Sequence, residues 1–510
     1  MTKLLKLLTH RVFRVAISIL VQLAVLLIVL LRFNDYYAAF NRICLALSML
    51  IVIWIVGDRS NPSYKIAWII PIMLFPIFGW LLYLLFGGNR LSKRARQKMQ
   101  RTEQVVAEEL QDAYKADELA QIAGEDAGNM ARYLEHKAHC PVYRNTQTEY
   151  FPLGEAQFES ILQELKNAQR YIFLEFFIIE PGKMWDAILE VLEEKVTAGV
   201  EVRVLYDDIG CMFTLPRNYD RVLKKKGIQC CVFNRFQPVL SVRMNNRDHR
   251  KILIVDGVVA YTGGTNLADE YINAKQRFGH WKDTAILLRG EAAWSFTVMF
   301  LNMWSMATGK KEEEFAAFRP MAQPLCEAAG FVQPYGDSPL DDEPVGETVY
   351  LNLTNKAKHY VYLTTPYLII DHATTMALTV AAKAGVDVRI ITPHIPDKKA
   401  IFEVTRAHYL PLLQAGVKIF EYTPGFIHAK IFAVDDRFAT VGTVNMDYRS
   451  MFLHFEDGVL LYDTPSVLDI KEDFLATQAV SQEITLEQCR GAALPRRILR
   501  ALLRIFAPLM

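Results

Sequence analysis

The chain has 510 residues, of which 52% are hydrophobic, and its formal net charge is +1. A chain of this length has room for about three to four domains, and its near-neutral charge argues against a nucleic-acid partner. The seven cysteines form neither a C-x-x-C pair nor a Cys/His metal spacing. We therefore expect reduced structural thiols, no metal and no cofactor.

Three apolar runs crowd the N-terminus, at residues 15–31, 43–57 and 66–88. A membrane-spanning helix needs about 20 apolar residues, so we predict a transmembrane region of two or three helices over residues 1–90. Pro71 and Pro76 should kink the third helix. A cleaved signal peptide is the alternative for the first run, but the further apolar runs after it favour a retained helix.

Basic residues follow the third run, namely Arg90, Lys93, Arg94, Arg96 and Lys98. The positive-inside rule therefore predicts a multi-pass membrane protein with everything after this point in the cytoplasm. Three spans would leave the basic N-terminus outside, which the same rule disfavours, so the number of spans stays open. We interpret the acidic, helix-patterned stretch at 91–138 as one connecting helix.

From residue 139 onward, strand and helix patterns alternate, and their order occurs twice. Apolar strands at 171–179 and 361–370 are each followed by a helix and then by a β-branched strand, at 198–208 and 384–394. This alternation predicts an α/β fold. Two units of similar order predict two similar domains, at 139–325 and 326–488, in a pseudo-two-fold arrangement.

The same polar motif occurs late in each half, as H-x-K, four residues, Asp, six residues and then G-[GT]-x-N. The copies pair His249 with His428, Lys251 with Lys430, Asp256 with Asp435, and Asn266 with Asn445. Because strand side chains alternate between faces, each His shares a face with its Lys, whereas each Asp has the opposite parity. Parity therefore predicts that the aspartates brace the strand ends rather than touch the same ligand.

Two histidines, two lysines and two asparagines that converge on one pocket make a phosphate site. The lysines neutralise phosphate oxygens, and the amides of Asn266 and Asn445 donate hydrogen bonds. One imidazole can attack phosphorus while the other protonates the leaving oxygen, which gives a two-step exchange through a phosphohistidine. A nucleophilic histidine needs an acceptor on its other nitrogen, and we favour Asp283 and Glu456 for this orienting role.

A lone His or Lys beside a strand usually has a structural role, but two copies in register favour function. At these residues the chain resembles the phospholipase D superfamily, whose hallmark is the paired HKD motif, over residues 140–485. The segments "GGTNLADEYIN", "WKDT", "NMDYRS" and "HFED", with "AWIIPIMLFPIFGWLLYLLFG" ahead of them, are similar to bacterial cardiolipin synthases. The implied fold is a set of N-terminal transmembrane helices followed by two phospholipase D-type α/β domains.

The resemblance also implies the reaction and the place where it occurs, the bacterial cell membrane. One phosphatidylglycerol gives its phosphatidyl group to a histidine and releases glycerol, and a second phosphatidylglycerol accepts the group to give cardiolipin. The implied catalytic residues are His249, Lys251, Asp256, His428, Lys430 and Asp435. His249 is the implied nucleophile, and His428 the acid and then the base. Gly264 and His454 depart from the family pattern, where Ser and Asn are frequent, which bears on lipid preference.

The C-terminal stretch at 489–510 predicts an amphipathic helix. Apolar residues recur at helical spacing, and Arg496, Arg497, Arg500 and Arg504 lie mostly on another face. This pattern is typical of a helix on an anionic membrane surface. The alternative is a helix packed on the soluble core with a solvated basic face.

Other functions remain as alternatives to lipid transfer. A membrane-bound hydrolase of the same superfamily would use water and give phosphatidic acid. A nuclease would need a basic groove with aromatic platforms, and an inactive scaffold would be expected to have lost a motif His or Lys. We expect phosphatidylglycerol and anionic membrane lipid as partners and no nucleic acid, and we leave a homo-oligomer open.

Overall fold

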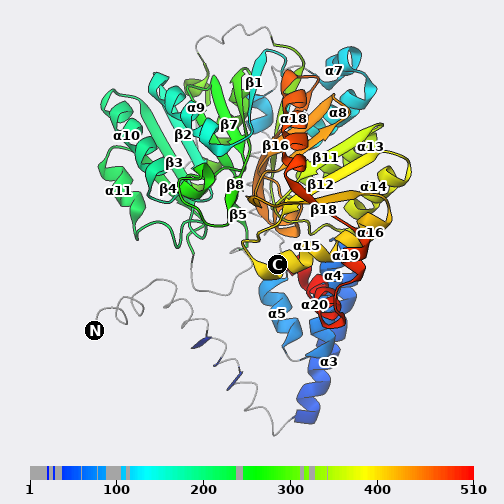
Figure 1. Cartoon of the computed structure of the whole chain (residues 1–510). Coiled ribbons are helices and arrows are strands. Elements are labelled where there is room, and N and C mark those ends of the chain that lie inside the picture. Colours follow the sequence, from blue (N-terminus) through cyan, green and yellow to red (C-terminus); the bar gives the residue numbers. More distant parts are fainter. Residues whose placement is uncertain are drawn as a thin grey trace.

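The computed structural model describes residues 37–58, 60–76, 78–87, 105–110, 115–236, 245–309, 315–320, 328–341 and 343–509, with a few isolated residues between 20 and 28. The first predicted span, at 15–31, lies largely outside these residues. Figure 1 shows two α/β domains side by side, and a group of helices that extends from one end of this body.

The first domain is a seven-stranded mixed sheet in the order β1-β9-β7-β6-β2-β3-β4. The strands are β1 (Thr146–Phe151), β2 (Tyr171–Phe176), β3 (Glu201–Asp207), β4 (Gln229–Phe233), β6 (Lys251–Val255), β7 (Val259–Gly263) and β9 (Ala285–Gly290). Strands β2, β3 and β4 are parallel, because helices cross over between them. The helices α9 (Gly154–Asn167), α10 (Lys183–Thr197) and α11 (Tyr219–Lys225) bury their apolar sides on one face of the sheet.

The second domain repeats this strand order as β10-β17-β16-β15-β11-β12-β13, with β18 added at the edge. The strands are β10 (Phe331–Asp337), β11 (Tyr360–Thr364), β12 (Asp387–Pro393), β13 (Lys418–Tyr422), β15 (Ile431–Val434), β16 (Phe438–Gly442), β17 (His454–Tyr462) and β18 (Ser481–Ile484). The helices around this sheet are α13 (Val345–Lys356), α14 (His372–Lys383), α15 (Lys399–Ala407), α16 (Tyr409–Gln414), α17 (Tyr448–Phe452) and α18 (Pro465–Ala479). The prediction of two similar α/β domains is confirmed.

One hydrophobic core joins the two domains. It contains Phe296 and Phe300 of α12 (Ala293–Thr308), Phe474 of α18, and inward-facing residues of both sheets such as Phe173 and Ile431. Helix α12 contacts β10 of the second domain, and α18 contacts β1 of the first. Because this shared core is fully buried, it fixes how the equivalent strands of the two sheets face each other.

The stretch predicted as one connecting helix is broken in its described part into a helical segment at 105–109 and the helices α7 (Ala116–Ala123) and α8 (Glu125–Ala138). Gly124 separates α7 from α8 with a φ of 86°, a left-handed conformation that favours glycine. Leu119 and Met130 are buried against the core of the second domain. This segment is therefore part of the body of the second domain rather than a separate connector.

The second apolar run lies in α3 (Tyr37–Gly57), and the third run is divided between α4 (Pro62–Leu74) and α5 (Gly79–Phe86). The kinked single helix predicted for 66–88 is wrong, because the chain turns back after α4. Helices α4 and α5 pack so closely that a Cβ on Gly79 would lie 2.4 Å from Cα of Ile72. Among the described residues, no helix is both long enough and apolar enough to span a lipid bilayer.

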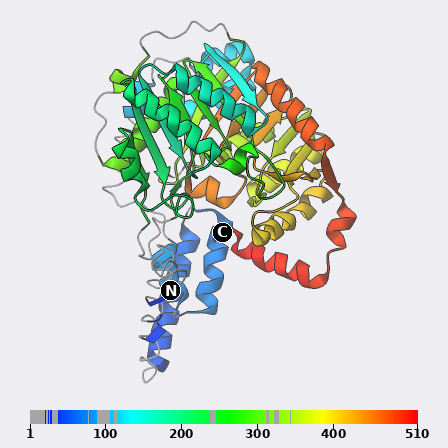
Figure 2. The same ribbon diagram turned by 60° about the vertical axis from the view of Figure 1, so that its left-hand side comes forward.

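The C-terminus packs beside these N-terminal helices, as Figures 1 and 2 show. It consists of α19 (Leu486–Arg490), α20 (Leu494–Phe506) and a 3-10 turn at Ala507–Leu509. Arg496 and Arg500 of α20 pair with Glu403 of α15. The opposite side of α20 leaves five large apolar residues exposed: Leu494, Ile498, Leu499, Leu502 and Phe506.

Candidate active site

Two short parallel strand pairs hold the residues before each motif histidine against a strand of the other domain. Strand β5 (Arg247–Asp248) pairs with the start of β17, and β14 (Gly425–Ile427) pairs with β8 (His280–Lys282). The backbone N–H of His249 donates to the carbonyl oxygen of Phe455 at 2.9 Å, and that of His428 donates to Lys282 at 2.7 Å. The pairing is reciprocal, so each motif histidine is anchored by the opposite domain.

Each motif histidine also contacts a carboxylate from the opposite repeat. Nδ1 of His249 lies 2.9 Å from both oxygens of Glu456, and Nδ1 of His428 lies 2.7 Å from Oδ2 of Asp283. Both carboxylates are fully buried. A carboxylate on Nδ1 favours the tautomer whose lone pair is on Nε2. Both acids were favoured from the sequence for the orienting role. The sequence did not indicate that each acid would contact the histidine of the opposite repeat.

The two repeats have different residues, Thr443 and Gly264, at the equivalent position beside the orienting acid. Thr443 donates its hydroxyl proton to Oε2 of Glu456 at 2.5 Å, and its hydroxyl oxygen accepts from the N–H of Asp457. The matching residue in the first repeat is Gly264. A Cβ there would lie 1.9 Å from Oδ1 of Asp283, so only glycine leaves room for this carboxylate. The sequence had shown Gly264 only as a departure from the family pattern.

The two motif lysines are almost completely buried, and each contacts the histidine of its own motif. Nζ of Lys251 donates to the carbonyl oxygen of His249 at 2.6 Å. Nζ of Lys430 donates to the carbonyl oxygen of His428 and lies 2.9 Å from Nδ1 of that ring. Burial lowers the pKa of Lys251 to about 8 and the pKa of Lys430 to about 7. Each lysine therefore loses its proton more readily than a lysine in water, and its charged form is weakly screened because it is buried.

The charges of both repeats act on each histidine. Burial, followed by the charges of Lys251 and Lys430, holds the pKa of His249 well below its usual value. Burial, followed by the charge of Lys430, lowers the pKa of His428 to about 4, although Asp283 opposes this. A phosphodiester anion between the lysines would offset their charge and raise the pKa of both imidazoles.

The motif asparagines occupy different environments. Asn266 accepts the N–H of Ile178 on Oδ1 and donates from Nδ2 to the hydroxyl of Tyr271, whose ring lies 5.7 Å from that of His428. Asn445 is buried, and its Oδ1 has no hydrogen-bond partner. The first amide therefore holds an aromatic side chain beside the site, and phosphate binding by either amide stays a proposal.

The motif aspartates lie away from the histidines. Asp256 accepts the backbone N–H groups of residues 169–171, and Asp435 accepts those of residues 358–360. Each stands at the far end of its strand, seven residues or about 23 Å from its histidine. These contacts brace the strand ends, as the parity of Asp256 and Asp435 predicted, and the catalytic role that the resemblance implied for the two aspartates stays a prediction.

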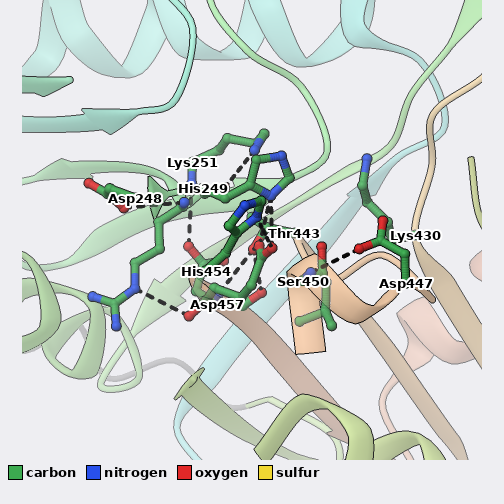
Figure 3. Close-up of polar contacts among 12 residues, drawn as sticks. Asp248, His249, Lys251, Lys430, Thr443, Asp447, Ser450, His454 and Asp457 are labelled. Atoms are coloured by element: carbon green, nitrogen blue, oxygen red, sulfur yellow. Dashed lines mark hydrogen bonds and ion pairs between the residues drawn. The ribbon is translucent and has the colours of Figure 1, made fainter. Parts of the chain in front are cut away.

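One side chain at the site received no role from the sequence. The strand register makes His454, two residues before Glu456, the counterpart of Trp281, two residues before Asp283. The ring of Trp281 lies 5.5 Å from that of His428, and the ring of His454 lies 5.4 Å from that of His249. Figure 3 shows His454 next to His249. The imidazole of His454 therefore lies next to that of His249, in addition to the two motif imidazoles.

Comparison with known proteins agrees with this geometry. A family model described as "Cardiolipin synthase, PLD-like domain" matches residues 161–304 and 350–477, and one described as "Phospholipase D-nuclease N-terminal" matches 46–88. An uncharacterised protein of Streptococcus mutans is 43% identical over 90% of this chain and 99% of its own length.

Two cardiolipin synthases are also similar over most of the chain. The one from Halalkalibacterium halodurans is 32% identical over 89% of this chain and 90% of its own length, and the one from Geobacillus kaustophilus is 35% identical over the same shares. The crystal structure of phosphatidylserine synthase from Haemophilus influenzae covers 74% of this chain and 97% of its own, with a TM-score of 0.57 and 14% identity. The chain belongs to the cardiolipin synthase family of phosphatidyltransferases, built on phospholipase D-like domains.

Proposed function

We propose that this chain makes cardiolipin by moving a phosphatidyl group from one phosphatidylglycerol to another, with release of glycerol. The observation that carries the proposal is that each repeat supplies the carboxylate that contacts the motif histidine of the other repeat. This arrangement leaves two buried imidazoles, each backed by a carboxylate, beside two buried lysines. Two acid–base groups are what a two-step transfer at phosphorus requires.

In the first step, Nε2 of His249 attacks phosphorus while the lysines neutralise the non-bridging oxygens. The phosphorus–oxygen bond to the headgroup glycerol breaks as the new phosphorus–nitrogen bond forms. His428, protonated in the presence of the substrate anion, gives its proton to the departing glycerol oxygen. Glu456 stabilises the positive charge that develops on the ring of His249.

In the second step, the headgroup hydroxyl of another phosphatidylglycerol enters the place that glycerol left. His428, now neutral, takes the hydroxyl proton as the oxygen attacks phosphorus. The phosphorus–nitrogen bond breaks and His249 is restored with its lone pair on Nε2. Asp283 stabilises the imidazolium of His428 at the end of this step, so the two acids serve the two histidines in turn.

The same proposal places the enzyme at the bacterial cell membrane. Apolar side chains are exposed on α3 and α4, such as Ile53 and Leu74, and on α20, such as Ile498 and Leu502. We propose that residues 1–90 form a multi-pass membrane region with the catalytic domains on the cytoplasmic side. Helix α20 would rest on anionic lipid through its exposed apolar face. We propose no nucleic-acid partner and leave a homo-oligomer open.

A product analysis tests the proposal. Purified protein in mixed micelles would receive phosphatidylglycerol labelled separately in the headgroup and in the acyl chains. Cardiolipin and free glycerol in equal amounts are the expected products. Phosphatidic acid with glycerol would mean that water is the acceptor and that the chain is a hydrolase. Absence of both lipid products would refute phosphatidyl transfer from this donor.

A further inference from the structure

The active site holds a group of three potential metal ligands. His249, His454 and Glu456 each offer one ligand atom, and these atoms all lie within 4.8 Å of one another. All three side chains are buried. The sequence spacing had predicted no metal, because His249 lies in a different repeat from the other two and only the fold brings them together.

The unpartnered ring of His454 is a second, independent indication that the site binds an ion. Both nitrogens of its ring are buried without a hydrogen-bond partner. Nδ1 lies 3.5 Å from Oε1 of Glu456, outside good hydrogen-bond geometry. A buried polar group without a partner costs free energy unless something satisfies it. An imidazole in this condition, next to a second imidazole and a carboxylate, is available to bind an ion.

The opposite half of the site lacks this arrangement. Trp281 takes the place of His454 beside His428, and its Nε1 lies 3.4 Å from Oδ2 of Asp283. An indole N–H can donate a hydrogen bond but has no lone pair for a metal. A metal would therefore bind on the His249 side alone, which is the side of the proposed nucleophile.

We infer that His249, His454 and Glu456 form a binding site for a zinc-like divalent cation, and that the cation switches the enzyme off. Two imidazoles and one carboxylate with an open fourth position are a ligand set that zinc takes. With bonds of about 2.1 Å, tetrahedral ligand atoms lie about 3.4 Å apart, so the side chains must close slightly on the ion. Magnesium and calcium, which prefer oxygen ligands, fit this set poorly.

Binding at either nitrogen of His249 would block the proposed attack on phosphorus. A metal on Nε2 takes the attacking lone pair directly. A metal on Nδ1 displaces the proton that Glu456 accepts, and this proton moves to Nε2, where it removes the same lone pair. Glu456 is also diverted from orienting the ring. The charges of Lys251 and Lys430 oppose a cation, so chelators should release it readily. This inhibitory consequence rests on the proposed function, whereas the metal site itself does not.

The test uses the full chain in detergent, freed of metal by a chelator. Zinc would be titrated against a chromophoric competitor, and phosphatidylglycerol turnover would be followed in parallel. We expect one bound zinc per chain, loss of turnover as the site fills, and recovery with EDTA. Bound cobalt should give the strong visible absorption of a tetrahedral site. Absence of stoichiometric zinc and cobalt binding by the wild-type chain would overturn the inference.

A pair of variants locates the site. His454→Asn should bind zinc at least about tenfold more weakly than the wild-type chain. His394→Asn, which alters a partly exposed imidazole paired with Glu421 elsewhere in the second domain, should leave binding and inhibition unchanged. Zinc binding by His454→Asn as tight as wild type would also overturn the inference. If zinc binds as expected but no cardiolipin forms, the metal site stands and the proposed function fails.

Discussion

Glu456 is the third residue of β17 in the second repeat, yet both of its carboxylate oxygens lie 2.9 Å from Nδ1 of His249 in the first repeat. Asp283 of the first repeat makes the reciprocal contact with His428 at 2.7 Å. Each motif histidine therefore contacts a carboxylate from the other repeat. The inter-domain core around α12 and α18 holds the two halves of the site together as well as stabilising the fold.

Glu456→Gln should slow the first step of the reaction. The amide nearly keeps the volume of the side chain but cannot stabilise a positive charge on His249 or select its tautomer. We expect kcat to fall by about 10²–10⁴-fold, the usual size of a positioned acid–base contribution. Single-turnover release of labelled glycerol measures this step. Glu421→Gln is the matched control, because Glu421 is equally buried and pairs with His394 and Arg406 away from the site. Glycerol release by Glu456→Gln within threefold of wild type would contradict the orienting role.

The twin motif allowed much of this site to be predicted from sequence. Repeated order indicated two α/β domains, and strand parity separated Asp256 and Asp435 from the histidines. The exchange of Asp283 and Glu456 was beyond prediction, since it depends on how two domains face each other and no local pattern encodes this.

Other features were also hidden for physical reasons. An alignment of the letters "HWKD" with "HFED" makes His280 the counterpart of His454. The strand register instead makes Trp281 the structural counterpart of His454. The run at 66–88 is apolar throughout, so it carries no periodic signal for the turn between α4 and α5. That turn depends on Gly79, whose lack of a side chain permits close packing.

Asp256→Ala should destabilise the protein without altering its chemistry. Three backbone N–H groups, one exposed and two partly buried, would lose their acceptor, and a hydrogen bond of this kind contributes about 0.5–1.5 kcal/mol. Asp256→Asn should cost less, because asparagine keeps an acceptor oxygen and tolerates the φ of 53°. Thermal denaturation midpoints should follow the order wild type, Asn, Ala. Equal turnover per folded enzyme is expected, and a loss in a well-folded Asp256→Asn would support a catalytic role.

The pH dependence should have an alkaline limb set by the lysines. Lysine is charged below its pKa, so Lys430, with a pKa of about 7, and Lys251, with a pKa of about 8, lose their charge as pH rises through these values. Phosphate binding weakens in parallel, and kcat/KM should fall. On the acid side, the lowered pKa of His249 keeps it neutral well below pH 6.5.

Initial rates at low substrate across the pH range measure this profile. Lys430→Arg supplies the control, because a guanidinium stays charged and should remove the lower of the two alkaline transitions. A profile that is flat from neutral to strongly alkaline pH would show that the lysines keep their charge and that their burial does not govern binding.

The exposed apolar face of α20 should be needed for binding to lipid vesicles and not for turnover in micelles. Replacing Ile498 and Leu502 with Asp removes apolar side chains that are each more than half exposed, while the contacts of Arg496 and Arg500 with Glu403 remain. Burial of one such side chain contributes about 1.5–3 kcal/mol, so vesicle affinity should fall at least tenfold. Sedimentation with phosphatidylglycerol vesicles measures it. Val380→Asp, at an exposed apolar position on α14, is the control, and unchanged sedimentation of the double variant would support a helix that only packs on the protein.

The central claim is that His249 carries the phosphatidyl group between two lipids. Phosphatidylglycerol labelled in its phosphate would be mixed with wild-type enzyme, His249→Ala and His428→Ala, and each reaction quenched in alkali, which removes the acyl chains but leaves the phosphorus–nitrogen bond. We predict label on the wild-type protein, localised to His249 by peptide mass, label on His428→Ala at a slower rate, and none on His249→Ala. Label on His428, or cardiolipin formation by His249→Ala at a near-normal rate, would contradict the account.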